Sequence, residues 1–353
     1  MNAEQDFVGT VEPTGQDVLD ADKLADWMTA NVSGFTGPVT VRKFAGGQSN
    51  PTYRLDSPSG SYVLRRKPFG PLLPSAHAVD REFAVIAGLH PTGFPVARPY
   101  GLCTDDSVLG SWFYVMSMVE GRTIWDGSLP TATPAERTDT YNAMIDTLAA
   151  LHNVDHVAAG LGDFGKAGNY FERQVGRWTK QYRAAETETM PDMEALIDYL
   201  ARTIPEQTRT SIVHGDYRID NMIFDAHEPK VLAVLDWELS TTGDPLADFS
   251  YLMMNWLTPA DQRAGLAGLD LPALGIPTLD EAVARYCAAT GRDGVPQLDW
   301  YFAFGLFRLA SIVQGIKKRV IDGTASSAHA AEMATRVPYL AERAWDFARK
   351  AGA

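Results

Sequence analysis

Apolar residues follow two different spacings along the chain, and the change between them divides it in two. From residue 39 to residue 68, β-branched and aromatic residues alternate around two turn-forming stretches, GGQSN (46–50) and SPSG (57–60). This pattern predicts three strands with short connections. Similar patterns predict helices over 17–32 and 75–90 and strands over 97–103 and 111–121. Residues before about 17 are polar and aperiodic, which predicts a loose arm.

From about residue 130 the apolar spacing becomes helical. Helices are predicted over 136–155, 171–183 and 193–203, a pair of short strands is expected around 214–221, and helices resume toward the C-terminus. We therefore predict an α+β fold of two lobes, a small β-rich N-terminal lobe over 18–119 and a larger, mostly helical C-terminal lobe over 120–353. A ligand is expected in the crevice between them.

Composition limits the class of protein. The chain has 353 residues, 45% of them hydrophobic, which is enough for a sizeable core, and a formal net charge of −13. It offers no basic face for nucleic acid and no polybasic membrane anchor, and the apolar stretch 301–320 is broken by Arg308 and Gln314. Two cysteines without a CxxC motif and the lack of a signal peptide favour a reducing, cytoplasmic location. The oligomeric state stays open, a homodimer included.

The stretch HGDYRIDN (214–221) places polar residues between two apolar runs. Asp216 and Asn221 lie five residues apart, and Asp236 ends the next strand-like run, VLAVLD. Two carboxylates and an amide suit Mg²⁺, which prefers oxygen ligands and shares its site with phosphates. The other carboxylate could then accept a proton from a nucleophile. The alternative is a turn in which the aspartates only cap backbone N–H groups.

These residues carry a resemblance to a known family. The Asp-x-x-x-x-Asn spacing followed by an Asp at a strand end resembles the catalytic loop and metal site of protein kinases. With LDWE and GDPLADFSY downstream, the chain is similar to the aminoglycoside phosphotransferase family, which also includes choline kinases. The phrases VLRRKP, SAHAVDREF and LDWELSTTGDPLAD look closest to a kinase-like domain that is found alone in bacteria or fused to acyl-CoA dehydrogenases. The resemblance implies a bilobal protein-kinase-like fold.

The resemblance also implies roles in the second half of the chain. Asp216 resembles the base that accepts the proton of the substrate hydroxyl, and Asn221 and Asp236 resemble the Mg²⁺ ligands. Arg218 resembles a cation that stabilises the transferring phosphoryl group. His214 is expected to keep the loop in shape and His152 to be structural, while Asp220 is expected to stabilise the turn. For Asp248, a brace for the loop and a simple helix-start carboxylate both stay open.

In the first half, the resemblance implies an ATP site. The turn that contains Gly46, Gly47, Ser49 and Asn50 would cover the phosphates, although by itself it is an ordinary hairpin turn. Alternation places Val63 and Arg65 on one face, so that Val63 would cover adenine and Arg65 would contact the phosphates. Arg65 stands where protein kinases have Lys, and it needs a carboxylate partner, for which Glu82 is the candidate. The further expectations are a solvated Arg66 and adenine contacts from the linker residues Met118 and Val119.

The function predicted from these observations is that of an ATP- and Mg²⁺-dependent phosphotransferase acting on a hydroxyl of a small molecule. The resemblance to the domain that is fused to acyl-CoA dehydrogenases implies a hydroxyacyl-CoA or a related hydroxy acid as the acceptor. Arg308, in an apolar helix, is a candidate acceptor-site cation. The stripe of Arg173, Arg177 and Lys180 is a weaker candidate, because a solvated helix face is the simpler interpretation. The alternatives are an aminoglycoside kinase, a nucleotide-binding module without turnover and a metal-dependent phosphohydrolase.

Overall fold

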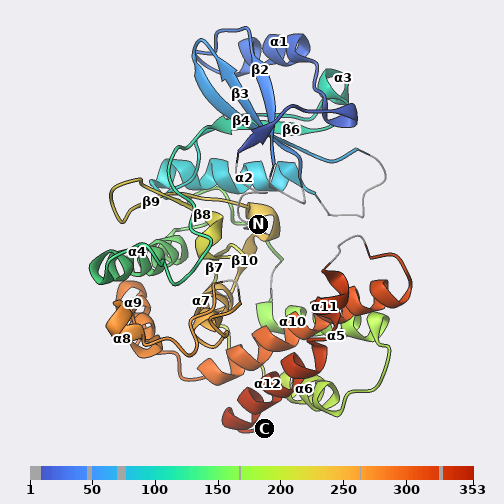
Figure 1. Ribbon diagram of the computed structural model, residues 1–353, viewed down its shortest axis with the longest axis vertical. Coiled ribbons are helices and arrows are strands. Elements are labelled where there is room, and N and C mark those ends of the chain that lie inside the picture. Colours follow the sequence, from blue (N-terminus) through green and yellow to red (C-terminus); the bar gives the residue numbers. More distant parts are fainter. Residues whose placement is uncertain (1–8, 46–49, 70–76, 167, 263, 326–328) are drawn as a thin grey trace.

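The fold has two lobes of different composition. The structure is a computed structural model that describes residues 9–45, 50–69, 77–166, 168–262, 264–325 and 329–353. Figure 1 shows a strand-rich lobe above a larger helical lobe, with α2 lying between the sheet and the large lobe. The predicted α+β, bilobal architecture is confirmed.

The small lobe is built on one antiparallel sheet of six strands in the order β1-β2-β3-β4-β6-β5. The strands are β1 (Thr10–Val11), β2 (Thr40–Phe44), β3 (Thr52–Ser57), β4 (Gly60–Arg66), β5 (Pro99–Cys103) and β6 (Phe113–Ser117). The strands predicted over 39–68 are β2, β3 and β4, which pair as consecutive neighbours. The alternation along β4 turns Leu64 toward the core under α1 and Arg65 toward the large lobe.

Two longer helices cover the sheet. The small-lobe helices are α1 (Ala21–Asn31), α2 (Val79–Leu89) and α3 (Asp106–Leu109), with 3₁₀ turns η2 (Gly15–Asp17) and η3 (His90–Thr92). α1 begins where the Asp20 side chain accepts a hydrogen bond from the backbone N–H of Lys23 (3.1 Å), and its Leu24 and Met28 are fully buried. The Val85 and Leu89 side chains of α2 instead join the core of the large lobe, so α2 links the two lobes.

Residues 10–17 pack on the small lobe, which corrects the expectation of a loose arm for this stretch. Thr10 and Val11 pair with β2, and the Asp17 carboxylate forms ion pairs with Lys43 (2.5 Å) and Arg66 (3.2 Å). We therefore propose that the lobe begins before residue 18.

The expectation of a solvated Arg66 is wrong for the same reason. Arg66 does point away from Arg65, but its side chain is 1% exposed because the N-terminal segment covers that face of the sheet. Its guanidinium donates to the Tyr53 hydroxyl (3.1 Å) and lies over the Phe69 ring (4.0 Å). A buried guanidinium is tolerated because these groups and Asp17 satisfy its donors.

The large lobe consists of helices around two short ribbons. Its helices are α4 (Pro134–Asn153), α5 (Tyr170–Ala185), α6 (Pro191–Arg202), α7 (Leu246–Met253), α8 (Leu271–Leu274), α9 (Leu279–Thr290), α10 (Leu298–Ile321), α11 (Ala330–Ala334) and α12 (Val337–Lys350). Its other elements are β7 (Ser211–Val213), β8 (Met222–Phe224), β9 (Val231–Val234), β10 (Thr241–Gly243) and the 3₁₀ turns η4 (Ile219–Asn221), η5 (Trp237–Leu239) and η6 (Met254–Trp256). α10 packs against α5, α7 and α12. Within the described part of the chain, no helix is long and apolar enough to cross a membrane.

The two strands that flank HGDYRIDN do not pair with each other. β7 pairs with β10, and β8 pairs with β9, both antiparallel. Figure 1 places these ribbons on the side of the large lobe that faces α2. The loop 214–221 therefore passes from one ribbon to the other at the surface that meets the small lobe.

The linker between the lobes is fixed to β8. After β6 ends at Ser117, Arg122 exchanges two backbone hydrogen bonds with Phe224 (2.8 and 2.9 Å). Gly121 lies so close to this strand that an added Cβ would sit 2.3 Å from the Phe224 carbonyl oxygen. We propose the domain boundary near residue 119 on these grounds.

Replacing Gly121 by alanine should therefore loosen the linker. We expect Gly121→Ala to lower the free energy of unfolding by about 1–3 kcal/mol, since the backbone of β8 cannot move away from a new methyl group without cost. Gly176, an exposed position inside α5 with open space around it, is the matched control. Gly176→Ala should raise the free energy of unfolding by about 0.5–1 kcal/mol, because alanine favours the helix. Urea denaturation measures both, and equal changes would contradict the close approach.

Candidate active site

The loop that follows β7 is held from below by Asp248. This carboxylate, 1% exposed in the first turn of α7, accepts hydrogen bonds from the backbone N–H groups of His214 (2.5 Å) and Gly215 (2.8 Å). Burial acts to raise the pKa of Asp248, but His152, His214 and the Gly215 N–H outweigh it and hold this pKa below its ordinary value. Of the two readings of Asp248 left open by the sequence, the loop brace is the one that these contacts match.

His214 serves the shape of the same loop. Its ring is completely buried, and its Nε2 lies 2.8 Å from the carbonyl oxygen of Leu235, next to Asp236. Its Nδ1 lies 3.2 Å from the backbone nitrogen of Asp216. The ring thus joins the 214–221 loop to the end of β9 and has no open path to a substrate.

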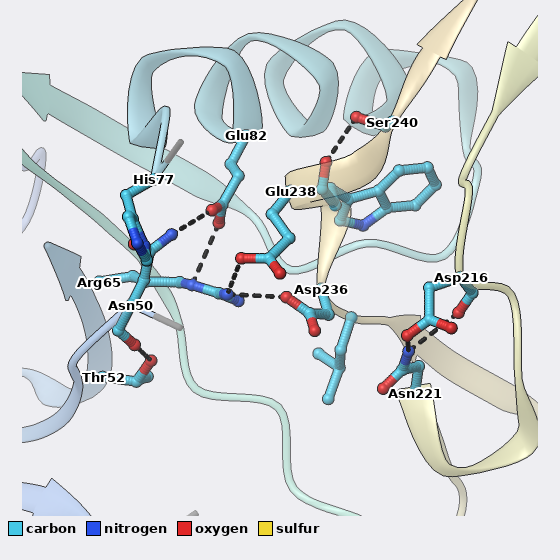
Figure 2. Close-up of polar contacts among 12 residues, drawn as sticks. Asn50, Thr52, Arg65, His77, Glu82, Asp216, Asn221, Asp236, Glu238 and Ser240 are labelled. Atoms are coloured by element: carbon cyan, nitrogen blue, oxygen red, sulfur yellow. Dashed lines mark hydrogen bonds and ion pairs between the residues drawn. The ribbon is translucent and has the colours of Figure 1, made fainter. Parts of the chain in front are cut away.

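Asp216 lies at the partly exposed end of the loop. Its Oδ1 accepts a hydrogen bond from the Tyr251 hydroxyl (2.9 Å), and its Oδ2 accepts one from the Asn221 amide nitrogen (3.1 Å). Arg218 adds an ion pair, with its Nε 3.4 Å from Oδ1. Figure 2 shows the Asp216 and Asn221 side chains facing each other. The carboxylate is therefore oriented on both oxygens while 23% of its side chain stays exposed.

Asp236 is brought next to Asn221 by the backbone. The Leu235 N–H donates to the Asn221 carbonyl oxygen (2.8 Å), and Asp236 follows in a left-handed conformation (φ 65°, ψ 61°). A non-glycine residue in this region costs about 1 kcal/mol or more, and such residues gather at functional sites. The turn aims the Asp236 carboxylate into the space between the lobes (Figure 2).

Arg65 is the centre of the ionic contacts across the cleft. Its guanidinium, 13% exposed, pairs with Glu82 of α2 (3.1 Å), Asp236 (2.7 Å) and Glu238 (3.7 Å). The predicted Arg65–Glu82 pair is thus confirmed, and Figure 2 shows the carboxylates around the guanidinium. Burial acts to lower the pKa of Arg65, but the carboxylates outweigh burial and raise it, so the guanidinium stays charged.

The Asn50 side chain turns inward, which leaves the expectation that the backbone amide of residue 50 faces the phosphates as a prediction. It is 1% exposed, its amide nitrogen donates to Glu82 (2.6 Å), and its amide oxygen lies 2.9 Å from Nδ1 of His77. The side chain therefore braces Glu82 and does not face the cleft, so a phosphate contact would have to come from the backbone. Gly46, Gly47 and Ser49, predicted with it, lie outside the described residues.

The remaining predicted nucleotide residues line the sheet and the linker. Val63 is opposite Met116 in the β4–β6 register, on the same face of β4 as Arg65. Met118, whose backbone nitrogen lies 3.4 Å from the Ser61 carbonyl oxygen, and Val119 follow in the linker, and both are half-buried. The assignment of Val63, Met118 and Val119 to adenine stays a prediction.

Three site residues were not assigned from the sequence. Tyr251 orients Asp216, Tyr114 donates to Glu82 (3.1 Å), and Glu238 joins the Arg65 cluster. Tyr251 and Glu238 stand in the quoted stretches GDPLADFSY and LDWE, so their positions carried a signal. Tyr114 is directly opposite Arg65 across β4 and β6, and only the strand register reveals it.

Two other predicted residues take more definite positions. Asp220, 6% exposed, accepts a hydrogen bond from Arg218 (3.1 Å), so this carboxylate anchors the arginine, and its expected role in the turn stays a prediction. Arg308 donates to the Gly215 carbonyl oxygen (3.0 Å) and lies between the Trp178 and Tyr251 rings (5.5 and 5.4 Å). Arg308 is thus part of the support of the 214–221 loop.

The basic stripe on α5 fits the simpler interpretation. Arg177 and Lys180 are exposed, and Arg173 donates to the Gly168 carbonyl oxygen (2.7 Å). The aromatic face of the same helix is buried as predicted, with Tyr182 fully inaccessible.

The donor atoms of the site suit a hard cation. The Asp236 carboxylate, 35% exposed, and the amide oxygen of Asn221, whose nitrogen is used by Asp216, are the oxygen atoms that could bind Mg²⁺. Three carboxylates around one guanidinium also leave an excess of negative charge. No group of three or more His, Cys, Asp or Glu among the described residues would hold a metal by itself, so further ligands would have to come from phosphates or water.

Comparison with known proteins identifies the family. A family model described as "Phosphotransferase enzyme family" matches residues 40–301. The chain belongs to this phosphotransferase family. In sequence it is similar to acyl-CoA dehydrogenase family member 10 of Mus musculus, with 46% identity over 319 residues, covering 90% of this chain and 30% of that protein. It is also similar to family member 11 of Gallus gallus, with 41% identity, covering 97% of this chain and 45% of that protein.

Solved structures agree with this assignment. A Ralstonia eutropha protein described as a candidate aminoglycoside phosphotransferase superposes with a TM-score of 0.88 at 50% identity, covering 94% of this chain and 99% of that chain. A spectinomycin phosphotransferase in complex with ADP and spectinomycin gives a TM-score of 0.59 at 10% identity, covering 93% and 98%, which shows a shared fold. The fold is that of aminoglycoside phosphotransferases, and the chain spans less than half of the length of the dehydrogenase-family relatives.

The protonation of Glu82 should make stability depend on pH. Burial raises the pKa of Glu82 to about 7, above its ordinary value of 4.5. Between pH 4.5 and about pH 7, Glu82 keeps a proton in the folded protein that it has released in the unfolded chain. Its contribution to the free energy of unfolding is therefore present at low pH and is lost as the pH rises toward 7. We predict that, from about pH 5 to about pH 7, the free energy of unfolding of the wild type falls relative to that of Glu82→Gln by up to about 1.4 kcal/mol per pH unit.

Urea denaturation at several pH values measures this difference. The exposed Glu12→Gln variant is the control and should keep the wild-type profile. Parallel profiles for wild type and Glu82→Gln would contradict the assignment of the titration to Glu82.

Proposed function

We propose that this protein is an ATP- and Mg²⁺-dependent phosphotransferase that phosphorylates a hydroxyl group of a small molecule. The proposal rests on one observation: two carboxylates, Asp216 and Asp236, lie at the same site but have different surroundings. Asp216 is oriented by Asn221 and Tyr251, while Asp236 is held by Arg65. A phosphotransferase needs this division, one carboxylate for the acceptor's proton and the other for the metal.

The proposed roles follow from the contacts. Asp216 accepts the proton of the acceptor hydroxyl. The oxygen of that hydroxyl bonds to the γ-phosphorus, and the bond between this phosphorus and the β–γ bridging oxygen breaks, which releases ADP. Arg218 stabilises negative charge on the transferring group. Asn221 and Asp236 hold Mg²⁺, which when bound offsets charge on the β- and γ-phosphates. Positioning and charge stabilisation supply the catalysis.

The nucleotide is proposed to lie against the small lobe. Arg65 would contact the α- and β-phosphates, Val63 would cover one face of adenine, and Met118 and Val119 would meet its edge. Gly46, Gly47, Ser49 and the backbone of Asn50 are proposed to cover the phosphates. Support comes from the shared fold with a phosphotransferase that was solved with AMP-PNP and hygromycin B (TM-score 0.58, 15% identity).

The acceptor is proposed to be a hydroxyacyl-CoA or a related hydroxy acid. The support is that proteins 37–46% identical to this chain are named as acyl-CoA dehydrogenases, in which the matching region is joined to a much longer chain. Enzymes joined in one chain commonly handle related compounds, so a module beside an acyl-CoA dehydrogenase is well placed to phosphorylate a hydroxylated acyl group.

Substitutions of Asp216 and Asp236 should have different effects, because the two carboxylates are proposed to have different roles. We expect Asp216→Asn to lower turnover by roughly 10²–10⁴-fold while stabilisation by ATP and Mg²⁺ stays close to that of the wild type, because only the proton acceptor is lost. Asp236→Ala should instead weaken Mg²⁺-dependent nucleotide binding. Asp198→Asn, on an exposed face of α6, is the control.

Thermal shift and a phosphate-transfer screen measure these outcomes. The screen compares hydroxyacyl-CoAs, hydroxy acids, amino alcohols, sugars and aminoglycosides. No stabilisation of the wild type by millimolar ATP and Mg²⁺ would overturn the proposal. Loss of folding stability alone in both variants would overturn the assigned roles.

A further inference from the structure

A cavity of about 260 Å³ opens in the large lobe beside Asp216. Two of its lining residues contact that carboxylate directly, Arg218 (3.4 Å) and Tyr251 (2.9 Å). The rest of the wall comes from the segment after α7 and from α10 and α12. Drug-sized ligands occupy pockets of about 300–1,000 Å³, so this space suits one part of a molecule whose reacting group reaches Asp216.

Part of the cavity wall is apolar. It is formed by Met254, Leu257, Leu306, Leu309, Leu340 and Phe347, while polar side chains such as Asn255, Thr258 and Gln262 also line the cavity. The apolar part can bury an alkyl chain.

The cavity lining carries positive charge. It contains Arg218, Arg336 and Arg343, and its one acidic residue among those that the structure describes, Asp220, is paired with Arg218. Arg336 donates to the neutral side-chain oxygen of Gln262, and among the described residues no carboxylate forms an ion pair with it.

Arg343 is only weakly neutralised. Its Nη1 lies 3.7 Å from the Asp346 carboxylate, which also pairs with Arg349, and its side chain is 38% exposed. The guanidinium groups of Arg336 and Arg343 thus line a partly apolar cavity, and their positive charge is not fully neutralised by neighbouring carboxylates. Guanidinium groups bind carboxylates and phosphates through paired hydrogen bonds.

We infer that this cavity receives the acyl chain of the acceptor and that Arg336 and Arg343 hold its anionic group. The inference rests on the proposed function and names the residues that select the substrate. The anionic group is the carboxylate of a free hydroxy acid or the phosphates of a CoA thioester, which share the same chemistry. Polycationic aminoglycosides are disfavoured, because their ammonium groups would meet the positive charge of these arginines.

Direct binding tests the inference without relying on turnover. The probes are a medium-chain hydroxy fatty acid, its CoA thioester and its neutral amide, measured by calorimetry on the wild type, Arg336→Gln and Arg343→Gln. We expect each substitution to weaken binding of at least one charged probe by about tenfold or more, while the amide changes much less. If the hydroxy fatty acid loses affinity, the arginines bind its carboxylate. If the CoA thioester loses affinity, they bind the phosphates of CoA.

Controls separate charge from folding. Arg336→Lys keeps the charge and should retain part of the binding, while Arg202→Gln, on an exposed face of α6, should bind like the wild type. Each further methylene should tighten wild-type binding by about fourfold until the cavity is full. Equal affinities of wild type and both glutamine variants for all charged probes would overturn the inference, as would tighter binding of kanamycin than of every acyl probe.

Turnover distinguishes the inference from the proposed function. If the wild type transfers phosphate to a hydroxyacyl acceptor, the glutamine variants should raise KM for the charged acceptor more than they lower kcat. If KM stays the same, the cavity assignment is wrong and the proposed function stands. If no acceptor is phosphorylated while binding still depends on the arginines, the proposed function fails and the cavity assignment stands.

Discussion

The site depends on one constraint, a guanidinium that cannot be buried alone. Arg65 of β4 is largely removed from water and is compensated by carboxylates from α2 and from the turn after β9. Because these segments belong to different lobes, satisfying this charge also fixes how the sheet meets the helical lobe. Asn50 and Tyr114 complete the arrangement by donating to Glu82. The Arg65 cluster is therefore both a lobe contact and the frame of the proposed nucleotide site.

Charge changes sign across the proposed active site. Toward the small lobe, three carboxylates surround one arginine, which favours a divalent cation between protein and phosphates. Toward the helices, Arg218, Arg336 and Arg343 line a partly apolar cavity. Asp216 stands between the two regions and contacts Arg218 on the helical side. A metal-bound nucleotide on one side and an anionic acyl acceptor on the other would match this distribution.

The support of the Asp216 loop comes from residues far away in sequence. Asp248 of α7 and Arg308 of α10 bind the backbone at His214 and Gly215, and His152 of α4 lies 3.6 Å from the Asp248 carboxylate. These groups do not reach the cleft, yet they determine where Asp216 lies.

The sequence alone determined the two lobes, the strands around residues 39–68 and the roles proposed for Asp216, Asn221 and Asp236, because local periodicity and short motifs carry that information. It also predicted the Arg65–Glu82 pair, since a charge on an apolar helix face requires a partner. Tertiary structure decided the rest. Arg66 is buried because the segment around Gln16, 50 residues earlier in the chain, folds over it. Asn50 turns inward because Glu82 and His77 meet it there. Tyr114, Tyr251 and the arginines of the cavity gain their positions from strand register and helix packing, which join residues that no local pattern connects.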